Sequence, residues 1–122
     1  MKRVLRYMPQ VFFLGVALVT ILSLIPSTAV PQAFQFWDKA QHSLAFAALS
    51  IAGSLAFPQR VKLVCTGLLA HGAVIEIMQS TLTTTRFGDV FDWLADGTGI
   101  LVGVGLYLYM MPKPAGELER SD

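Results

Sequence analysis

Residues 11–25 read VFFLGVALVTILSLI, a mainly apolar run that ends at Pro26. No Asp, Glu, Lys or Arg occurs between Tyr7 and Trp37. A helix that crosses a membrane needs about 20 mainly apolar residues, and a proline is typical of the place where a helix stops. This stretch therefore predicts a first spanning helix. A cleaved signal peptide is the alternative, but no clear small-x-small cleavage signal follows the run, and the apolar stretches further along favour a retained anchor.

Three further apolar stretches follow, and prolines end the first and the last of them: Ala40–Phe57, Val61–Thr81 and Val90–Met111. The connections are short, so consecutive helices should pack as antiparallel neighbours. The sequence predicts an all-α membrane protein whose four transmembrane helices form an antiparallel bundle over residues 1–112. A short polar tail follows at residues 113–122.

The composition supports this class. Of the 122 residues, 54% are hydrophobic and 14% are charged, whereas a soluble domain carries roughly 25% charged residues. The apolar content excludes a disordered chain. The net charge of +1 without a basic stripe argues against nucleic-acid binding. A single cysteine, Cys65, excludes an internal disulfide framework.

The positive charges predict the orientation, because Lys and Arg collect on the cytoplasmic side of a membrane protein. With the N-terminus inside, only Lys39 and Arg86 fall on the outer side. The other seven of the nine fall inside: Lys2, Arg3, Arg6, Arg60, Lys62, Lys113 and Arg120. We therefore predict that both termini, and the tail at residues 113–122, are cytoplasmic.

Most acidic residues gather instead near the outer ends of the predicted helices. The helical rise of about 1.5 Å per residue places His42, Glu76, Asp92 and Asp96 within about 3 to 9 Å of the outer face. Within each predicted helix the polar residues are three, four or seven residues apart, so those of one helix share one face. Asp38 pairs with His42 in this way, and Glu76 pairs with Gln79. The candidate polar site comprises Asp38, Lys39, His42, Glu76, Gln79, Arg86, Asp89, Asp92 and Asp96.

A carboxylate costs about 2.5–3.5 kcal/mol at the centre of a bilayer and less near its surface, so Glu76 and Asp96 should turn inward. They could form a polar clamp that only fixes helix packing. We favour a functional site, because the acids outnumber Lys39, Arg86 and His42, and excess carboxylates hold a proton or attract a cation. His42 with carboxylates is an acceptable donor set for a metal ion. However, the sequence has no compact signature such as His-Glu-x-x-His, so we predict neither a metal nor another cofactor.

These residues form three motifs on three predicted helices. Gly99 and Gly103, in the last motif, allow another helix to approach closely. The motifs are Asp38-Lys39-x-x-His42-x-x-x-Phe46, Ile75-Glu76-x-x-Gln79 and Arg86-x-x-Asp89-x-x-Asp92-x-x-x-Asp96-x-x-Gly99-x-x-x-Gly103.

Together, from Trp37 to Gly103, the motifs resemble the VanZ-like family of bacterial membrane proteins. The resemblance implies a four-helix bundle in the bacterial cytoplasmic membrane. It also implies a link to low-level resistance to the glycopeptide antibiotic teicoplanin, but no particular reaction. The family usually has asparagine where this chain has Asp96, and the extra carboxylate alters the charge balance.

We therefore expect the site to bind or modify an anionic component of the cell envelope, such as a lipid-linked molecule. Lys39 and Arg86 would contact the anionic group. The pair Asp38–His42 would orient an imidazole, and Glu76 or Asp96 would accept or donate a proton. Whether a reaction takes place is left open by the sequence. The expected partners are the lipid bilayer and this ligand, and a homo-oligomer is compatible with the sequence.

Two alternatives come from other classes. One is a structural or accessory protein whose polar layer only sets the packing of the helices. The other is a small proton- or cation-linked transporter. A conducting path needs polar groups across the full thickness of the membrane, and the fourth stretch carries no charge between Gly97 and Pro112.

Overall fold

Prolines and short polar segments divide the chain into helices close to the predicted bounds. The structure is a computed structural model that describes residues 2–26, 28, 38–85 and 87–111. The described residues are helical with short connections, which confirms the all-α class. The elements are α1 (Lys2–Leu5), α2 (Met8–Leu24), α4 (Asp38–Ala56), the 3-10 turn η2 (Pro58–Arg60), α5 (Val61–Leu82) and α6 (Val90–Met110).

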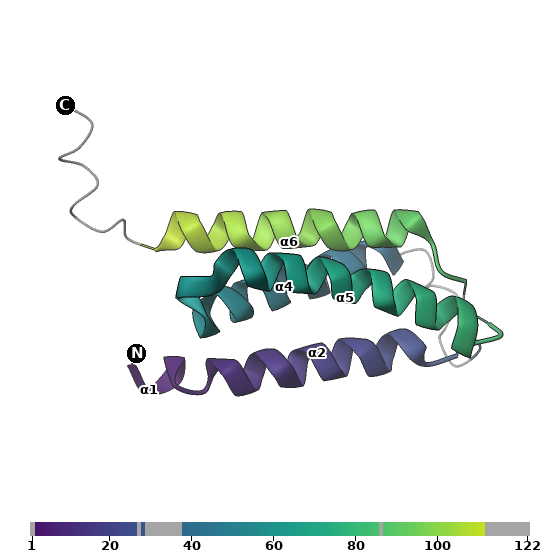
Figure 1. Ribbon diagram of the computed structural model, residues 1–122, viewed down its shortest axis with the longest axis horizontal. Helices are drawn as coiled ribbons and strands as arrows, with labels where there is room; N and C mark the ends of the chain where they lie inside the picture. The colour runs from purple at the N-terminus through teal and green to yellow at the C-terminus, as the bar shows by residue number, and fades with distance from the viewer. Residues whose placement is uncertain (1, 27, 29–37, 86, 112–122) are drawn as a thin grey trace, which may run out of the picture.

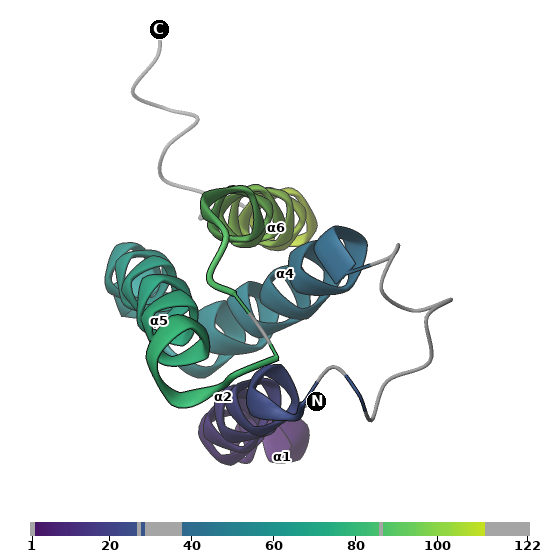
Figure 2. The same cartoon turned by 90° about the vertical axis from the view of Figure 1, so that its right-hand side faces the viewer.

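The four long helices alternate in direction (Figure 1). The start of α2 and the end of α6 lie at one end of the bundle, and the start of α6 lies at the other end with the end of α5. Seen along the bundle, α2 and α6 lie on opposite sides, with α4 and α5 between them (Figure 2). The most extensive helix contact joins α4 to α6.

Two glycines of α6 allow its backbone to pack closely against that of α4. A Cβ atom at Gly99 would collide with the backbone carbonyl of Ser43, and one at Gly103 would collide with Ala47 and Ser50. Both glycines are buried. Any larger residue at either position would push the two backbones apart.

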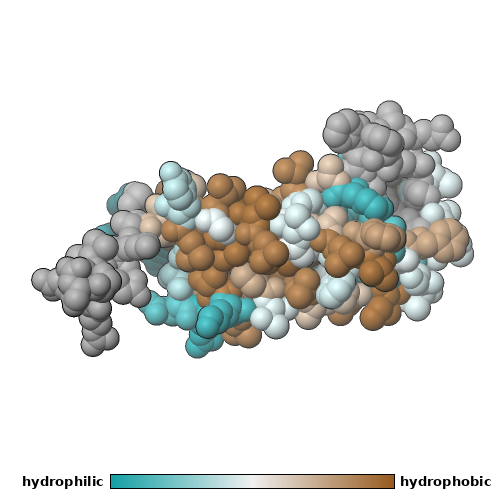
Figure 3. All heavy atoms as spheres, turned by 90° about the horizontal axis from the view of Figure 1, so that it is seen from above, coloured by the Kyte–Doolittle hydropathy of each residue, from teal (hydrophilic) through white to brown (hydrophobic). Residues whose placement is uncertain are grey.

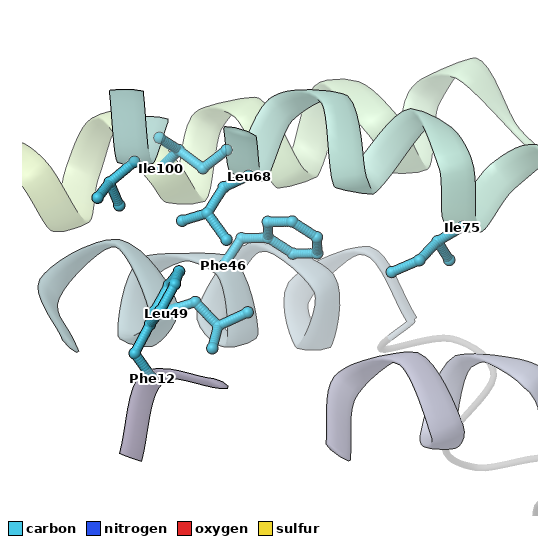
Figure 4. Packing of buried hydrophobic residues seen from close by; sticks show 7 residues of the cluster. Phe12, Phe46, Leu49, Leu68, Ile75 and Ile100 are labelled. Carbon is cyan, nitrogen blue, oxygen red and sulfur yellow. The ribbon is translucent and has the colours of Figure 1, made fainter. Parts of the chain in front are cut away.

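The apolar core is small. Figure 4 shows side chains from all four helices pointing into it, among them Phe12, Phe46, Leu68 and Ile100. Phe46 is fully buried at the middle of this cluster. The cluster also includes Leu49, Val64 and Ile75, so every long helix contributes to one apolar core.

The outer surface is largely apolar. On the face seen in Figure 3, hydrophobic residues cover the middle of the molecule, and hydrophilic residues lie towards its ends. Large apolar side chains point outward from every long helix, including Leu14, Leu44, Leu63 and Leu101, each more than half exposed. A water-soluble monomer rarely exposes so much contiguous apolar surface.

Two helical stretches among the described residues are long and apolar enough to cross a membrane, Pro58–Leu82 and Val90–Met110. The apolar helix α2 has 17 residues and is shorter. Helix α4 has 19 residues, but it carries Asp38, Lys39 and His42 in its first two turns. The predicted tail at residues 113–122 lies outside the described residues.

Candidate functional site

Four ionisable side chains from three helices meet near the end of the bundle where α6 begins. His42 comes from α4, Glu76 from α5, and Asp92 and Asp96 from α6, and all four are buried. His42, Glu76 and Asp92 each offer one ligand atom, and these atoms lie within 4.8 Å of one another. We call His42, Glu76, Asp92 and Asp96 the polar cluster.

The innermost contact of the polar cluster joins His42 to Asp96. The imidazole Nδ1 lies 2.9 Å from Oδ1 of Asp96, and the Asp96 side chain is fully buried. The second oxygen of Asp96, Oδ2, is buried without a hydrogen-bond partner. Gly72 of α5 makes room for this oxygen, since a Cβ atom at that position would lie 2.7 Å from it.

Glu76 connects the end of α5 to the loop before α6. Its Oε2 accepts a hydrogen bond from the backbone N–H of Asp89 at 2.7 Å. Its Oε1 is buried without a hydrogen-bond partner. Beside this contact, the N–H of Gly88 donates to Ser80 Oγ at 2.9 Å. The loop is therefore held against α5 by two hydrogen bonds, and one of them uses half of the Glu76 carboxylate.

Lys39 lies at the rim of the polar cluster. Its ammonium donates to Asp92 Oδ1 at 3.0 Å and to Asp89 Oδ2 at 3.2 Å, and its side chain is 57% exposed. Asp89 also caps α6, because its Oδ1 accepts a hydrogen bond from the N–H of Phe91 at 2.8 Å. This N–H and the Lys39 ammonium lower the pKa of Asp89, so the cap stays ionised at neutral pH.

The charges of the described side chains do not balance at this end of the bundle. Four carboxylates, those of Glu76, Asp89, Asp92 and Asp96, lie near one lysine and one histidine. A buried charge is stable only when it is paired and hydrogen-bonded. The polar cluster can therefore retain a proton, exchange one through His42, or attract a cation.

Two hollows lead to the polar cluster from opposite sides. One, of about 140 Å³, lies between α2 and α4 and is lined by Ser23, Gln41 and His42 among others. The other, of about 420 Å³, lies between α5 and α6 and is lined by Glu76 and Trp93 among others. Both hollows are partly open, and His42 lines the first while Glu76 lines the second.

Among the predicted site residues that the structure describes, Gln79 lies in neither the polar cluster nor its rim. Gln79 is buried, and its Nε2 donates to the backbone carbonyl of Ser23 at 2.9 Å, which joins α5 to α2. Arg86 and the side chain of Asp38 lie outside the described residues. Lys39 and Asp89 form the rim.

Two residues that shape this site were not predicted from the sequence. Gly72 leaves space for the Asp96 carboxylate, and the backbone carbonyl of Ser23 accepts a hydrogen bond from the Gln79 side chain. Gly72 stands four residues before Glu76, so the two share a helix face. That spacing is the feature of the sequence from which the place of Gly72 beside the site could have been predicted. The Ser23 contact depends on how α2 packs, and no local pattern encodes it.

Comparison with known proteins identified no relative: no family model, curated protein or solved structure matches the chain. The resemblance to the VanZ-like family therefore rests on the order and spacing of the polar residues alone.

Proposed function

We propose that the chain is a VanZ-like multi-pass protein of the bacterial cytoplasmic membrane that binds an anionic component of the cell envelope at its polar cluster. In this proposal the four long helices span the membrane, and both termini are cytoplasmic. The polar cluster then lies near the outer leaflet.

The distribution of side chains supports the membrane assignment. The long helices direct large apolar residues outward and polar residues inward, which is the arrangement a lipid environment favours. This explains α4 in particular, because His42, Ser50 and Ser54 are buried while Leu44 is exposed. At about 1.5 Å per residue, the 17 residues of α2 are shorter than the thickness of the hydrocarbon core, about 30 Å. Its proposed span therefore includes residues that flank the helix in the sequence.

The observation that carries the functional proposal is the meeting of four buried ionisable groups beneath two partly open hollows. Ionisable residues inside a membrane are costly and mark functional sites by default. The Asp96 carboxylate orients the His42 ring through Nδ1, as a carboxylate does for a histidine that exchanges protons. Lys39 at the rim is 57% exposed, so its ammonium can contact an anionic group in addition to Asp89 and Asp92.

A genetic complementation experiment tests this function. The gene is deleted in the source bacterium, and sensitivity to envelope-active antibiotics, including teicoplanin, is measured. Wild-type protein should restore the parental sensitivity, whereas His42→Ala and Glu76→Gln should not, at equal amounts of membrane-inserted protein. Gln59→Ala, at an exposed position in η2, is the matched control and should complement fully. Full complementation by both cluster variants would exclude this proposal.

A structural role is the second candidate, favoured by hydrogen bonds between helices elsewhere in the bundle. Thr20 Oγ1 of α2 lies 2.9 Å from His71 Nε2 of α5. The indole of Trp93 donates to the Leu69 carbonyl, also at 2.9 Å. If the polar cluster is one more such contact, its variants should lower the amount of folded protein, and any remaining protein should complement normally.

A further inference from the structure

We propose that the polar cluster binds one divalent transition-metal ion through His42, Glu76 and Asp92. Their ligand atoms lie within 4.8 Å of one another, so an ion at the centre would lie at most about 2.8 Å from each. Zinc forms bonds of about 2.0–2.2 Å to histidine nitrogen and carboxylate oxygen. Side-chain movements of less than about 1 Å would therefore complete the coordination.

The unpartnered oxygens of the polar cluster point independently to a cation. Glu76 Oε1 and Asp96 Oδ2 are both buried without a hydrogen-bond partner, and the two residues are 9% and 0% exposed. A buried acceptor left without a partner costs about 1–3 kcal/mol, and more when it is charged. A divalent ion bound by Glu76 would offset this cost for Oε1 and would also reduce the excess negative charge around Asp96.

The contact between His42 and Asp96 has the form seen around metal-bound histidines. A histidine that binds a metal through one ring nitrogen almost always gives its other N–H to a carboxylate, carbonyl or water. Asp96 Oδ1 is 2.9 Å from His42 Nδ1, so Asp96 would position the ring. Lys39 holds Asp92 by Oδ1, which orients that carboxylate from the opposite side.

The donor set selects the class of metal. Imidazole nitrogen favours zinc, iron and related ions, whereas sites for magnesium and calcium consist of oxygen ligands. One nitrogen and two carboxylates therefore favour Zn²⁺ or Mn²⁺. Three protein ligands leave a coordination position for water or substrate, as in catalytic zinc sites. The inference goes beyond the proposed function, because an ion could bind whether or not the site takes an envelope ligand.

Direct metal titration tests this inference. The full chain is purified in detergent micelles, stripped of metal with EDTA and titrated with ZnCl₂ or MnCl₂ by calorimetry. Elemental mass spectrometry then measures the amount of metal bound per chain. We expect one ion per chain. His42→Ala, Glu76→Gln and Asp92→Asn should each weaken binding at least tenfold. Asp96→Asn, which acts only through His42, should weaken it by about 10- to 100-fold or less.

Gln59→Ala is the control, since it changes an exposed polar side chain in η2, at the other end of α5 from the polar cluster. Its metal affinity should stay within about threefold of wild type, as it supplies no ligand. Circular dichroism establishes that each variant is folded, and Glu76→Gln keeps the test valid if His42→Ala does not fold. The absence of a stoichiometric ion on wild type, or wild-type affinity in folded Glu76→Gln, would overturn the inference. Neither result bears on the complementation experiment.

Discussion

Nδ1 of His42 and Oδ1 of Asp96 lie 2.9 Å apart and join the beginning of α4 to the second turn of α6. Both side chains are buried, so the loss of either partner leaves a buried polar group without this hydrogen bond. The pair therefore links the architecture to the chemistry of the site. It holds two helices together and fixes the orientation of the only histidine in the polar cluster.

Removing the carboxylate of Asp96 should destabilise the fold more than neutralising it. Asp96→Ala leaves the buried His42 ring without this partner, which costs about 1–3 kcal/mol. Asp96→Asn retains an oxygen for the ring and should cost less. Unfolding in sodium dodecyl sulfate, followed by circular dichroism, measures both variants. Equal stability of Asp96→Ala and wild type would show that the contact contributes nothing to folding.

Gly99→Ala should separate α4 from α6, because the new Cβ would meet the carbonyl oxygen of Ser43. Forcing an extra group into a packed contact costs about 1–3 kcal/mol. Gly105→Ala is the matched control in the same helix, since no atom lies within 4 Å of its added Cβ. It should be neutral or stabilising, because alanine is the better helix former. The same unfolding measurement compares them, and effects of equal size would contradict the packing argument.

Gln79→Leu should loosen α2 from α5. The substitution removes the bond from the Gln79 amide to the Ser23 carbonyl and leaves a buried acceptor without this donor, at a cost of about 1 kcal/mol or more. Gln59→Leu changes an exposed glutamine and should have little effect. Because Gln79 is not in the polar cluster, Gln79→Leu should keep wild-type metal affinity. A tenfold loss of that affinity would place Gln79 among the determinants of the site.

The proposed orientation can be tested by labelling single cysteines. In a Cys65→Ser background, cysteine is introduced at Phe87 or at Gln59, both exposed at opposite ends of α5. A membrane-impermeant maleimide added to intact spheroplasts should label Phe87→Cys and spare Gln59→Cys until the membrane is opened. The reverse pattern would invert the topology and place the polar cluster on the cytoplasmic side.

The helices could be predicted because their determinants are local. Pro26 and Pro58 stand where α2 and α4 end, and the predicted start of the third stretch, Val61, is also the first residue of α5. The four-residue helix α1 was not predicted, since so short a segment has no measurable periodicity. Helix spacing also indicated which polar residues share a face, as Asp92 and Asp96 do.

The partners across helices were harder to predict. Gln79 has the same spacing from Glu76 as Asp92 has from Asp89, yet it packs against α2. Rotation of a helix about its axis by a fraction of a turn decides which neighbouring helix a side chain contacts. That rotation depends on the packing of the whole bundle. For the same reason the ligands of the proposed metal site form no compact motif in the sequence, because they come from three helices.

The glycine contact between α4 and α6 also has a kinetic consequence. Among the described helices, α4 and α6 make the most extensive contact, whereas the contacts of α2 with its neighbours are less extensive. The hollow that reaches His42 lies between α2 and α4. An outward swing of α2 would widen it and would break the contact between Thr20 and His71 and the hydrogen bond that Gln79 donates to Ser23. The rate of that motion would set how quickly a bound molecule exchanges with the lipid phase.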